Sequence, residues 1–155
     1  MSIRLPTSQT LYQQDFYLWI NTTIEQIRSQ HLESVDWEHL LEELEDLGNA
    51  PKHKLESRLL VLLEHLLKLA YWSAEREYNA RRWKGTIIEQ RKQLKKLLKN
   101  NPSLKPYLTE VFEETYQDAR DIVIVKTELA SNVLPIQPAF TLEQVLDESW
   151  LPNLD

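Results

Sequence analysis

Leucine recurs every three or four residues between Pro51 and Trp72 of this 155-residue chain. This is helical spacing, because an α-helix turns once in about 3.6 residues, so one series of leucines shares a face and a second series borders it. The two series are Leu55, Leu59, Leu62, Leu66 and Leu69, and Leu60, Leu63 and Leu67. A helix with so broad an apolar face has to be covered by other helices. The pattern therefore predicts that this segment is the central helix of an all-α bundle.

Glycine and cysteine usage narrows the fold and the chemistry further. Only two glycines, Gly48 and Gly85, are present, which leaves few of the tight turns that an all-β fold requires. So few glycines also exclude a glycine-rich phosphate loop. The chain has no cysteine, so disulfides, thiolate metal sites and cysteine nucleophiles are excluded. Apolar residues make up 42% and charged residues 27%, the balance of a folded globular protein.

Apolar residues at helical spacing predict five main helices and one short C-terminal helix. Asp36 and Thr141 are suited to cap helix N-termini, Gly48 to end the second helix, and Pro51 to begin the third. The expected helices lie at about residues 11–31, 36–47, 51–72, 79–99 and 103–129, with the short helix within 141–150.

We expect these helices to form a single domain over residues 1–155. Its parts are an N-terminal arm over 1–10, a helical bundle over 11–129 and a C-terminal strap over 130–155. The arm has no apolar segment of the kind found in signal peptides. The most apolar stretch, residues 59–71, contains Glu64 and Lys68 and is too short and polar to span a bilayer. We therefore expect a cytoplasmic protein without a membrane partner.

The segment 37–53 places two histidines at either end of a cluster of carboxylates. On a helical wheel its apolar residues up to Leu47 fall within roughly 120°, and most of its ionisable residues fall opposite. We expect the apolar set to face the core: Trp37, Leu40, Leu41, Leu44 and Leu47. We expect the polar set to face solvent: Glu38, His39, Glu42, Glu45 and Asp46, with Glu43 at the border.

An alternative interpretation of this segment is a metal-dependent enzyme built on His39, Glu43 and His53. His39 and Glu43 lie four residues apart and could chelate an ion from one helical face. A carboxylate-bridged site in a helical bundle needs inward-facing glutamates and Glu-x-x-His pairs, and no such pair occurs in this sequence. None of the serines has the glycine-flanked setting of a catalytic nucleophile. We therefore expect no catalytic residue, no metal and no cofactor.

Basic residues are concentrated in one predicted helix. Residues 76–99 contain nine basic and two acidic residues, a local charge of +7 in a chain whose net charge is −6. Those predicted to share one face are Arg81, Lys84, Arg91, Lys92, Lys95, Lys96 and Lys99. Such a face is typical of phosphate-binding surfaces, so a nucleic-acid-associated, antitoxin-like regulator using residues 79–99 is a second alternative. The acidic total charge and the lack of a helix-turn-helix pattern disfavour it.

Six segments in order resemble the bacterial family catalogued as domain of unknown function 29. They are "LYQQDFYLWI" at 11–20, "LESVDWEHLLEELEDLG" at 32–48, "KLESRLLVLLEHLLKL" at 54–69, "IIEQRKQLKKLL" at 87–98, "PSLKPYL" at 102–108 and "FTLEQVLDESWLP" at 140–152. The resemblance implies a compact, all-helical bacterial protein and brings no activity, cofactor or catalytic residue. The chain departs from the family after "HLLKL", where it reads "AYWSAEREYNARRW" without the usual proline, so the turn between the third and fourth helices is in question.

The sequence favours a non-catalytic protein–protein interaction or regulatory module. Its expected working surfaces are the acidic face around Glu38–Asp46 and the basic face around Arg81–Lys99. The expected partner is another protein or a second copy of the chain, since the acidic face of one copy can meet the basic face of another. Nucleic acid is the less favoured partner.

Overall fold

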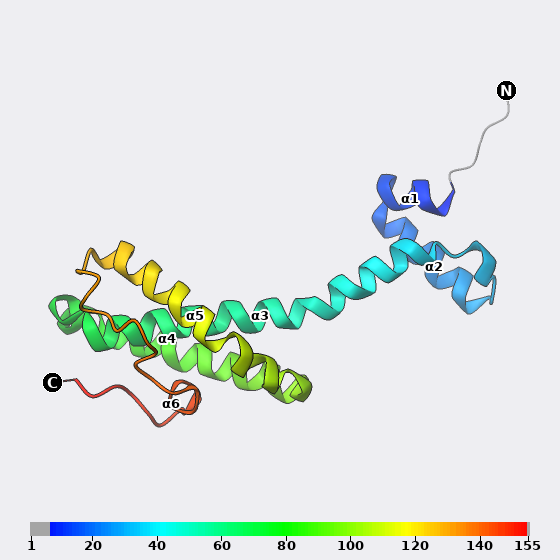
Figure 1. Cartoon of the computed structure of the whole chain (residues 1–155). Coiled ribbons are helices and arrows are strands. Elements are labelled where there is room, and N and C mark those ends of the chain that lie inside the picture. The colour runs from blue at the N-terminus through cyan, green and yellow to red at the C-terminus, as the bar shows by residue number, and fades with distance from the viewer. Residues whose placement is uncertain (1–6, 155) are drawn as a thin grey trace. The chain divides into compact units, whose positions relative to one another are not determined.

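The structure, a computed structural model, describes residues 7–154, and no strand occurs among them, which confirms the all-α class. The first six residues of the expected N-terminal arm lie outside the described residues, and residues 8–10 already belong to the first helix. The helices are α1 (Ser8–Gln14), α2 (Phe16–Arg28), η1 (Leu32–Ser34), α3 (Trp37–Tyr71), α4 (Ser73–Asn100), η2 (Pro102–Leu104), α5 (Lys105–Thr127) and α6 (Leu142–Leu146) (Figure 1).

The chain divides into two compact units, one extending to Asn49 and the other beginning at Ala50. The boundary lies inside α3, so this helix contributes to both units. Neither unit contains a helix long and apolar enough to cross a bilayer, as far as the described residues extend.

α3 is one helix of 35 residues, although the sequence predicted two helices separated at Gly48. Gly48 does not end the helix, because no glycine among the described residues has a positive φ. Pro51 lies inside α3 and not in a first turn. A proline removes one helical hydrogen bond, but leucine, glutamate and lysine on both sides are strong helix formers that continue the helix. The predicted break between residues 47 and 51 was therefore wrong.

The expected first helix is divided at Asp15, where the backbone is extended with φ −150° and ψ 90°. The carboxylate of Asp15 accepts a hydrogen bond from the backbone N–H of Leu18 at 3.0 Å and so caps α2. The break allows α1 to fold back beside α2, where the ring of Tyr12 packs edge-on against Trp19 with centroids 4.8 Å apart. The predicted single helix over residues 11–31 did not include this break, because the apolar spacing continues through Asp15.

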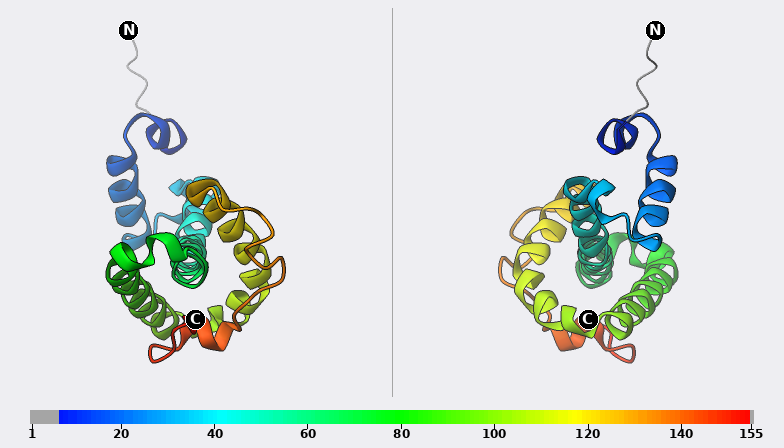
Figure 2. Two further views of the ribbon diagram at one scale, coloured as in Figure 1. Left: turned by 90° about the vertical axis from the view of Figure 1, so that its left-hand side faces the viewer. Right: turned by 90° about the vertical axis from the view of Figure 1, so that its right-hand side faces the viewer.

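The second unit contains the main core, in which α4 and α5 lie on two sides of the leucine-rich half of α3 (Figure 2). All five leucines of the predicted central stripe are 0% exposed, as are Leu63 and Leu67. α4 begins at Ser73, immediately after Trp72, and not near residue 79 as expected. α5 continues to Thr127, so the β-branched residues 122–125 are helical. The predicted central position of the leucine-rich segment 51–72 is confirmed.

The C-terminal strap is held to α5 and then to α4. Its first part is bound to α5, where the Tyr116 hydroxyl donates to the carbonyl of Pro135 at 2.8 Å and Arg120 Nε donates to that of Leu134 at 3.1 Å. The strap then forms α6, which Thr141 caps as predicted, in a reciprocal pair of hydrogen bonds with Gln144. Such a capping box satisfies two free N–H groups at the start of a helix. Leu134, Phe140 and Val145 of the strap belong to the core.

The apolar face of α3 in the first unit is exposed, although the sequence predicted it to face the core. The exposed fractions are 52% for Trp37, 59% for Leu41, 55% for Leu44 and 70% for Leu47, and only Leu40 is half-buried. The prediction was wrong because helical spacing identifies an apolar face but not the element that covers it. We call Trp37, Leu41, Leu44 and Leu47 the apolar stripe.

Replacing a leucine in each half of α3 tests this difference. We expect Leu62→Ala to lower the free energy of unfolding by about 2–5 kcal/mol, because it leaves a cavity in the core. We expect Leu44→Ala to change it by less than about 0.5 kcal/mol, because the side chain is exposed and alanine is as good a helix former. Urea unfolding followed by circular dichroism measures both. A loss for Leu44→Ala as large as that for Leu62→Ala would contradict the exposed stripe.

Candidate functional site

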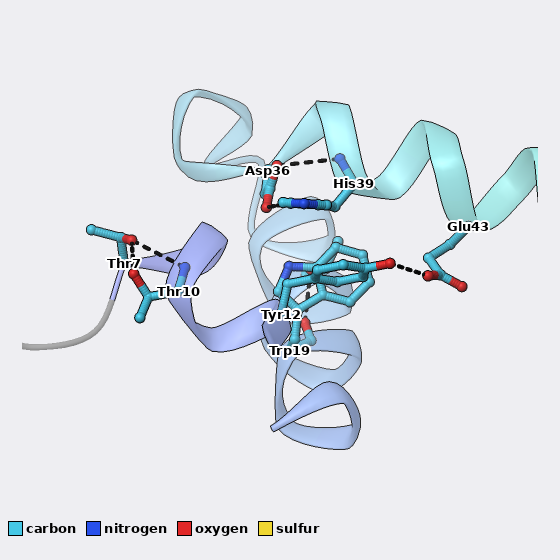
Figure 3. A network of polar contacts seen from close by, with 8 residues as sticks. Thr7, Thr10, Tyr12, Trp19, Asp36, His39 and Glu43 are labelled. Carbon is cyan, nitrogen blue, oxygen red and sulfur yellow. Dashed lines mark hydrogen bonds and ion pairs between the residues drawn. The ribbon is translucent and has the colours of Figure 1, made fainter. Parts of the chain in front are cut away.

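Asp36 is the residue before α3, and its buried carboxylate contacts two nitrogen atoms of His39 (Figure 3). One oxygen accepts a hydrogen bond from the backbone N–H of His39 at 3.3 Å, which confirms the predicted N-cap. The other oxygen lies 2.6 Å from Nδ1 of the same histidine. Asp36 therefore both begins the helix and fixes the orientation of the His39 ring.

His39 and Glu43 both contact Tyr12, which comes from α1 (Figure 3). The Tyr12 ring stacks on the His39 ring with centroids 3.9 Å apart and planes 18° apart. The Tyr12 hydroxyl donates a hydrogen bond to Oε1 of Glu43 at 2.5 Å. Tyr12 also packs on the buried ring of Trp19, so this cluster joins the polar side of α3 to the small core of the first unit. We call Tyr12, Asp36, His39 and Glu43 the polar cluster.

The polar cluster shifts the pKa values of two of its members. The hydrogen bond to the Glu43 carboxylate raises the pKa of Tyr12 to about 12, because ionising the phenol would place two negative charges side by side. The hydrogen bond to Asp36 raises the pKa of His39, since the carboxylate stabilises the imidazolium. Tyr12 therefore keeps its proton at neutral pH. The cluster joins α1 to the first turns of α3.

The residues of the metal alternative belong to different units, with His39 and Glu43 in the first and His53 in the second. His39 and Glu43 each contact Tyr12, while Nδ1 of His53 lies 4.0 Å from Oε2 of Glu56 in the second unit. Across residues 7–154, no group of three or more histidine, aspartate or glutamate side chains is placed to hold a metal ion. His39 is half-buried, so the expectation that it faces solvent was wrong. Glu43, expected at the border of the two faces, is also half-buried.

Four other carboxylates of the acidic face are exposed: Glu38, Glu42, Glu45 and Asp46. None of the four forms an ion pair with any residue in the described part of the chain. Residues 1–49 contain nine acidic and two basic residues, a net charge of −7, which leaves +1 for the rest of a chain of net charge −6. The negative charge of the protein is therefore concentrated in the first unit.

Two of the free carboxylates border the apolar stripe. Residues three and four apart are neighbours on a helix surface, so Glu38 and Glu45 both lie beside Leu41. On the other border, Glu43 lies four residues before Leu47 and is held by Tyr12. The first unit thus presents an apolar stripe with negative charge along its edge.

The predicted basic face of α4 is only partly a surface. Arg81, Lys92, Lys95, Lys96 and Lys99 are exposed and Lys84 is half-buried, whereas Arg91 is 2% exposed. Arg91 is therefore not part of the surface, which corrects the sequence prediction. It lies four residues after Ile87 and three before Leu94, which are both buried, and this spacing was the signal that the charge pattern concealed.

Arg91 holds the C-terminal strap. Its Nε donates to the carbonyl of Val145 at 2.8 Å, and its terminal nitrogens donate to those of Trp150 at 2.7 Å and Gln144 at 3.2 Å. Glu148 of the strap lies 3.8 Å from Nζ of Lys92 and 3.9 Å from that of Lys95. The strap thus offsets part of the positive charge that a nucleic acid would contact.

Comparison with known proteins gives one match. The sequence model of a family described as "Domain of unknown function DUF29" matches residues 11–151. No curated protein and no solved structure matches the chain.

The pKa of His39 tests the polar cluster. We expect the nuclear magnetic resonance titration of the His39 ring to give a midpoint above the ordinary value of 6.5. Asp36→Asn should move it back toward that value, because asparagine retains the N-cap but not the charge. Protonated His39 stabilises the folded first unit at low pH, and this contribution is lost as the pH rises through the raised pKa. A parent midpoint at or below 6.5 would contradict the Asp36–His39 pair.

Proposed function

The chain belongs to the DUF29 family, whose description assigns no activity, and we propose from its surfaces that it is a non-catalytic module that binds another protein. The binding surface is the apolar stripe of α3 with the carboxylates along its border. The observation that carries this proposal is the exposure of all four stripe residues by half or more on one face of one helix. Contiguous apolar surface of this kind on a folded protein commonly marks an interaction site.

The polar cluster supports this assignment, because it explains why the stripe is exposed within its own unit. α3 uses the side that carries His39 and Glu43 to contact Tyr12. The stripe lies on a different side of the same helix and contributes nothing to these contacts. The first unit therefore keeps its fold without covering the stripe.

The partner that matches this surface is a basic amphipathic helix. An apolar face on that helix would cover the stripe, and lysine or arginine along its edge would meet Glu38 and Glu45. A second copy bound through the same surface would bring together two units of net charge −7 and is disfavoured by repulsion. The basic face of α4 in a second copy is also a poor match, because it offers little apolar surface to cover the stripe. Among the described residues of α4, Ile88, 48% exposed, is the one large aliphatic side chain that is exposed.

A synthetic amphipathic peptide of leucine and lysine tests the proposal, with a leucine and glutamate peptide of the same pattern as control. We expect the lysine peptide to bind with an affinity that falls as salt rises, and the glutamate peptide not to bind. Leu44→Gln with Leu47→Gln should weaken binding at least about tenfold, because each leucine buried is worth about 1.5–3 kcal/mol. Fluorescence anisotropy of the labelled peptides measures both effects.

Ile136→Gln is the matched control, since it removes another exposed aliphatic side chain, 66% exposed, from the strap. It should leave peptide binding unchanged. Equal binding by the parent and the Leu44→Gln, Leu47→Gln variant would overturn the proposal. A sedimenting dimer of the parent that this variant dissociates would instead assign the stripe to a second copy.

A further inference from the structure

A cavity of about 700 Å³ lies in the second unit, where the C-terminal strap meets the end of α4. This volume is within the range of about 300–1,000 Å³ that is usual for small-molecule sites. α4, the first residue of η2, the first residue of α5 and residues 146–149 of the strap line the cavity. None of these residues belongs to the surface proposed above to bind a protein, so the cavity is a separate candidate site.

The apolar part of the lining comes from Leu98, Pro102 and Leu146. Leu98 and Leu146 are half-buried and pack against the main core, so they form a fixed apolar wall. Such a wall favours a ligand with an apolar body, because burying that body removes both surfaces from water.

The charged part of the lining has an excess of free cations. Lys99 and Lys105 form no ion pair with any residue in the described range, and Lys95 lies 3.9 Å from Glu148. The other carboxylate, Asp147, already accepts hydrogen bonds from the backbone N–H of Ser149 at 2.9 Å and from its hydroxyl at 2.7 Å. Two lysines beside an apolar wall thus lack a partner, and an anionic group would supply one.

Arg91 maintains the cavity by holding its strap side. Its guanidinium lines the cavity and donates three hydrogen bonds to strap carbonyls. A lysine at this position would keep the charge but could not make three hydrogen bonds in the fixed geometry of a planar guanidinium. The shape of the cavity therefore depends on Arg91, whose hydrogen-bond donors bind the strap and need not bind the ligand.

We propose that this cavity binds a small anionic amphiphile, with its acid group near Lys99 and Lys105 and its apolar body against Leu98 and Leu146. The acid group is a carboxylate or a phosphate monoester, which are recognised by the same lysine chemistry. The proposal is independent of protein binding by the apolar stripe, because the two rest on different units and different residues.

Calorimetric titration with four probes tests this proposal: octanoate, octyl phosphate, octan-1-ol and inorganic phosphate. We expect binding of octanoate, octyl phosphate or both, which distinguishes the two acid groups, and at least tenfold weaker binding of octanol and of inorganic phosphate. Methyl resonances of Leu98 and Leu146 should shift on binding. Binding of octanol as tight as that of octanoate, or shifts confined to the apolar stripe, would overturn the proposal.

Paired variants inside and outside the cavity provide the matched comparison. Lys99→Gln with Lys105→Gln should weaken binding of the acid probe at least tenfold and leave the melting temperature unchanged, because both side chains are exposed. Arg81→Gln with Lys96→Gln removes the same charge from α4 outside the cavity and should change binding less than twofold. Arg91→Lys should raise amide hydrogen exchange in residues 141–150 and lose binding. Equal weakening by the two double variants, or full binding by Arg91→Lys with a released strap, would contradict the cavity as the site.

Discussion

The contact of Tyr12 with His39 and Glu43 decides which side of α3 faces inward in the first unit. Asp36 orients the imidazole, the imidazole stacks on the phenol, and the phenol donates to the glutamate one turn further along the helix. Of the α3 side chains that contact Tyr12, the pattern of apolar and polar residues assigned His39 to solvent and Glu43 to the border. The apolar stripe is exposed as a consequence, and the proposed interaction surface depends on this arrangement.

The two halves of α3 show what the sequence can and cannot predict. In the second half, leucines occupy so much of the circumference that any neighbour must cover them, and the five leucines of the central stripe are buried as predicted. In the first half the apolar arc is narrower and the covering element is small. Helical spacing located the arc correctly, but Tyr12, 31 positions before Glu43, selected the other side. A contact between residues so distant in sequence leaves no periodic signal.

Rules based on adjacent residues predicted some helix ends correctly and others wrongly. Asp36 and Thr141 cap helices as expected, because a cap depends on a few adjacent residues. Gly48 and Pro51 did not end or begin a helix, since strong helix formers on both sides continued it.

Arg91 was assigned to a surface by its charge, whereas its spacing from Ile87 and Leu94 placed it at the core, where backbone carbonyls accept its hydrogen bonds. Of the predicted site, the exposed carboxylates and lysines were therefore foreseeable, and the buried polar contacts were not.

The central claim is that α3 exposes its apolar stripe while the polar cluster faces inward, and hydroxyl-radical footprinting with mass spectrometry measures this residue by residue. We expect Trp37, Leu41, Leu44 and Leu47 to be oxidised rapidly in the folded protein, and Trp19 and Leu62 to be protected, in line with their exposed fractions. Protection of Leu44 and Leu47 to the level of Leu62 in the dilute protein would contradict the account.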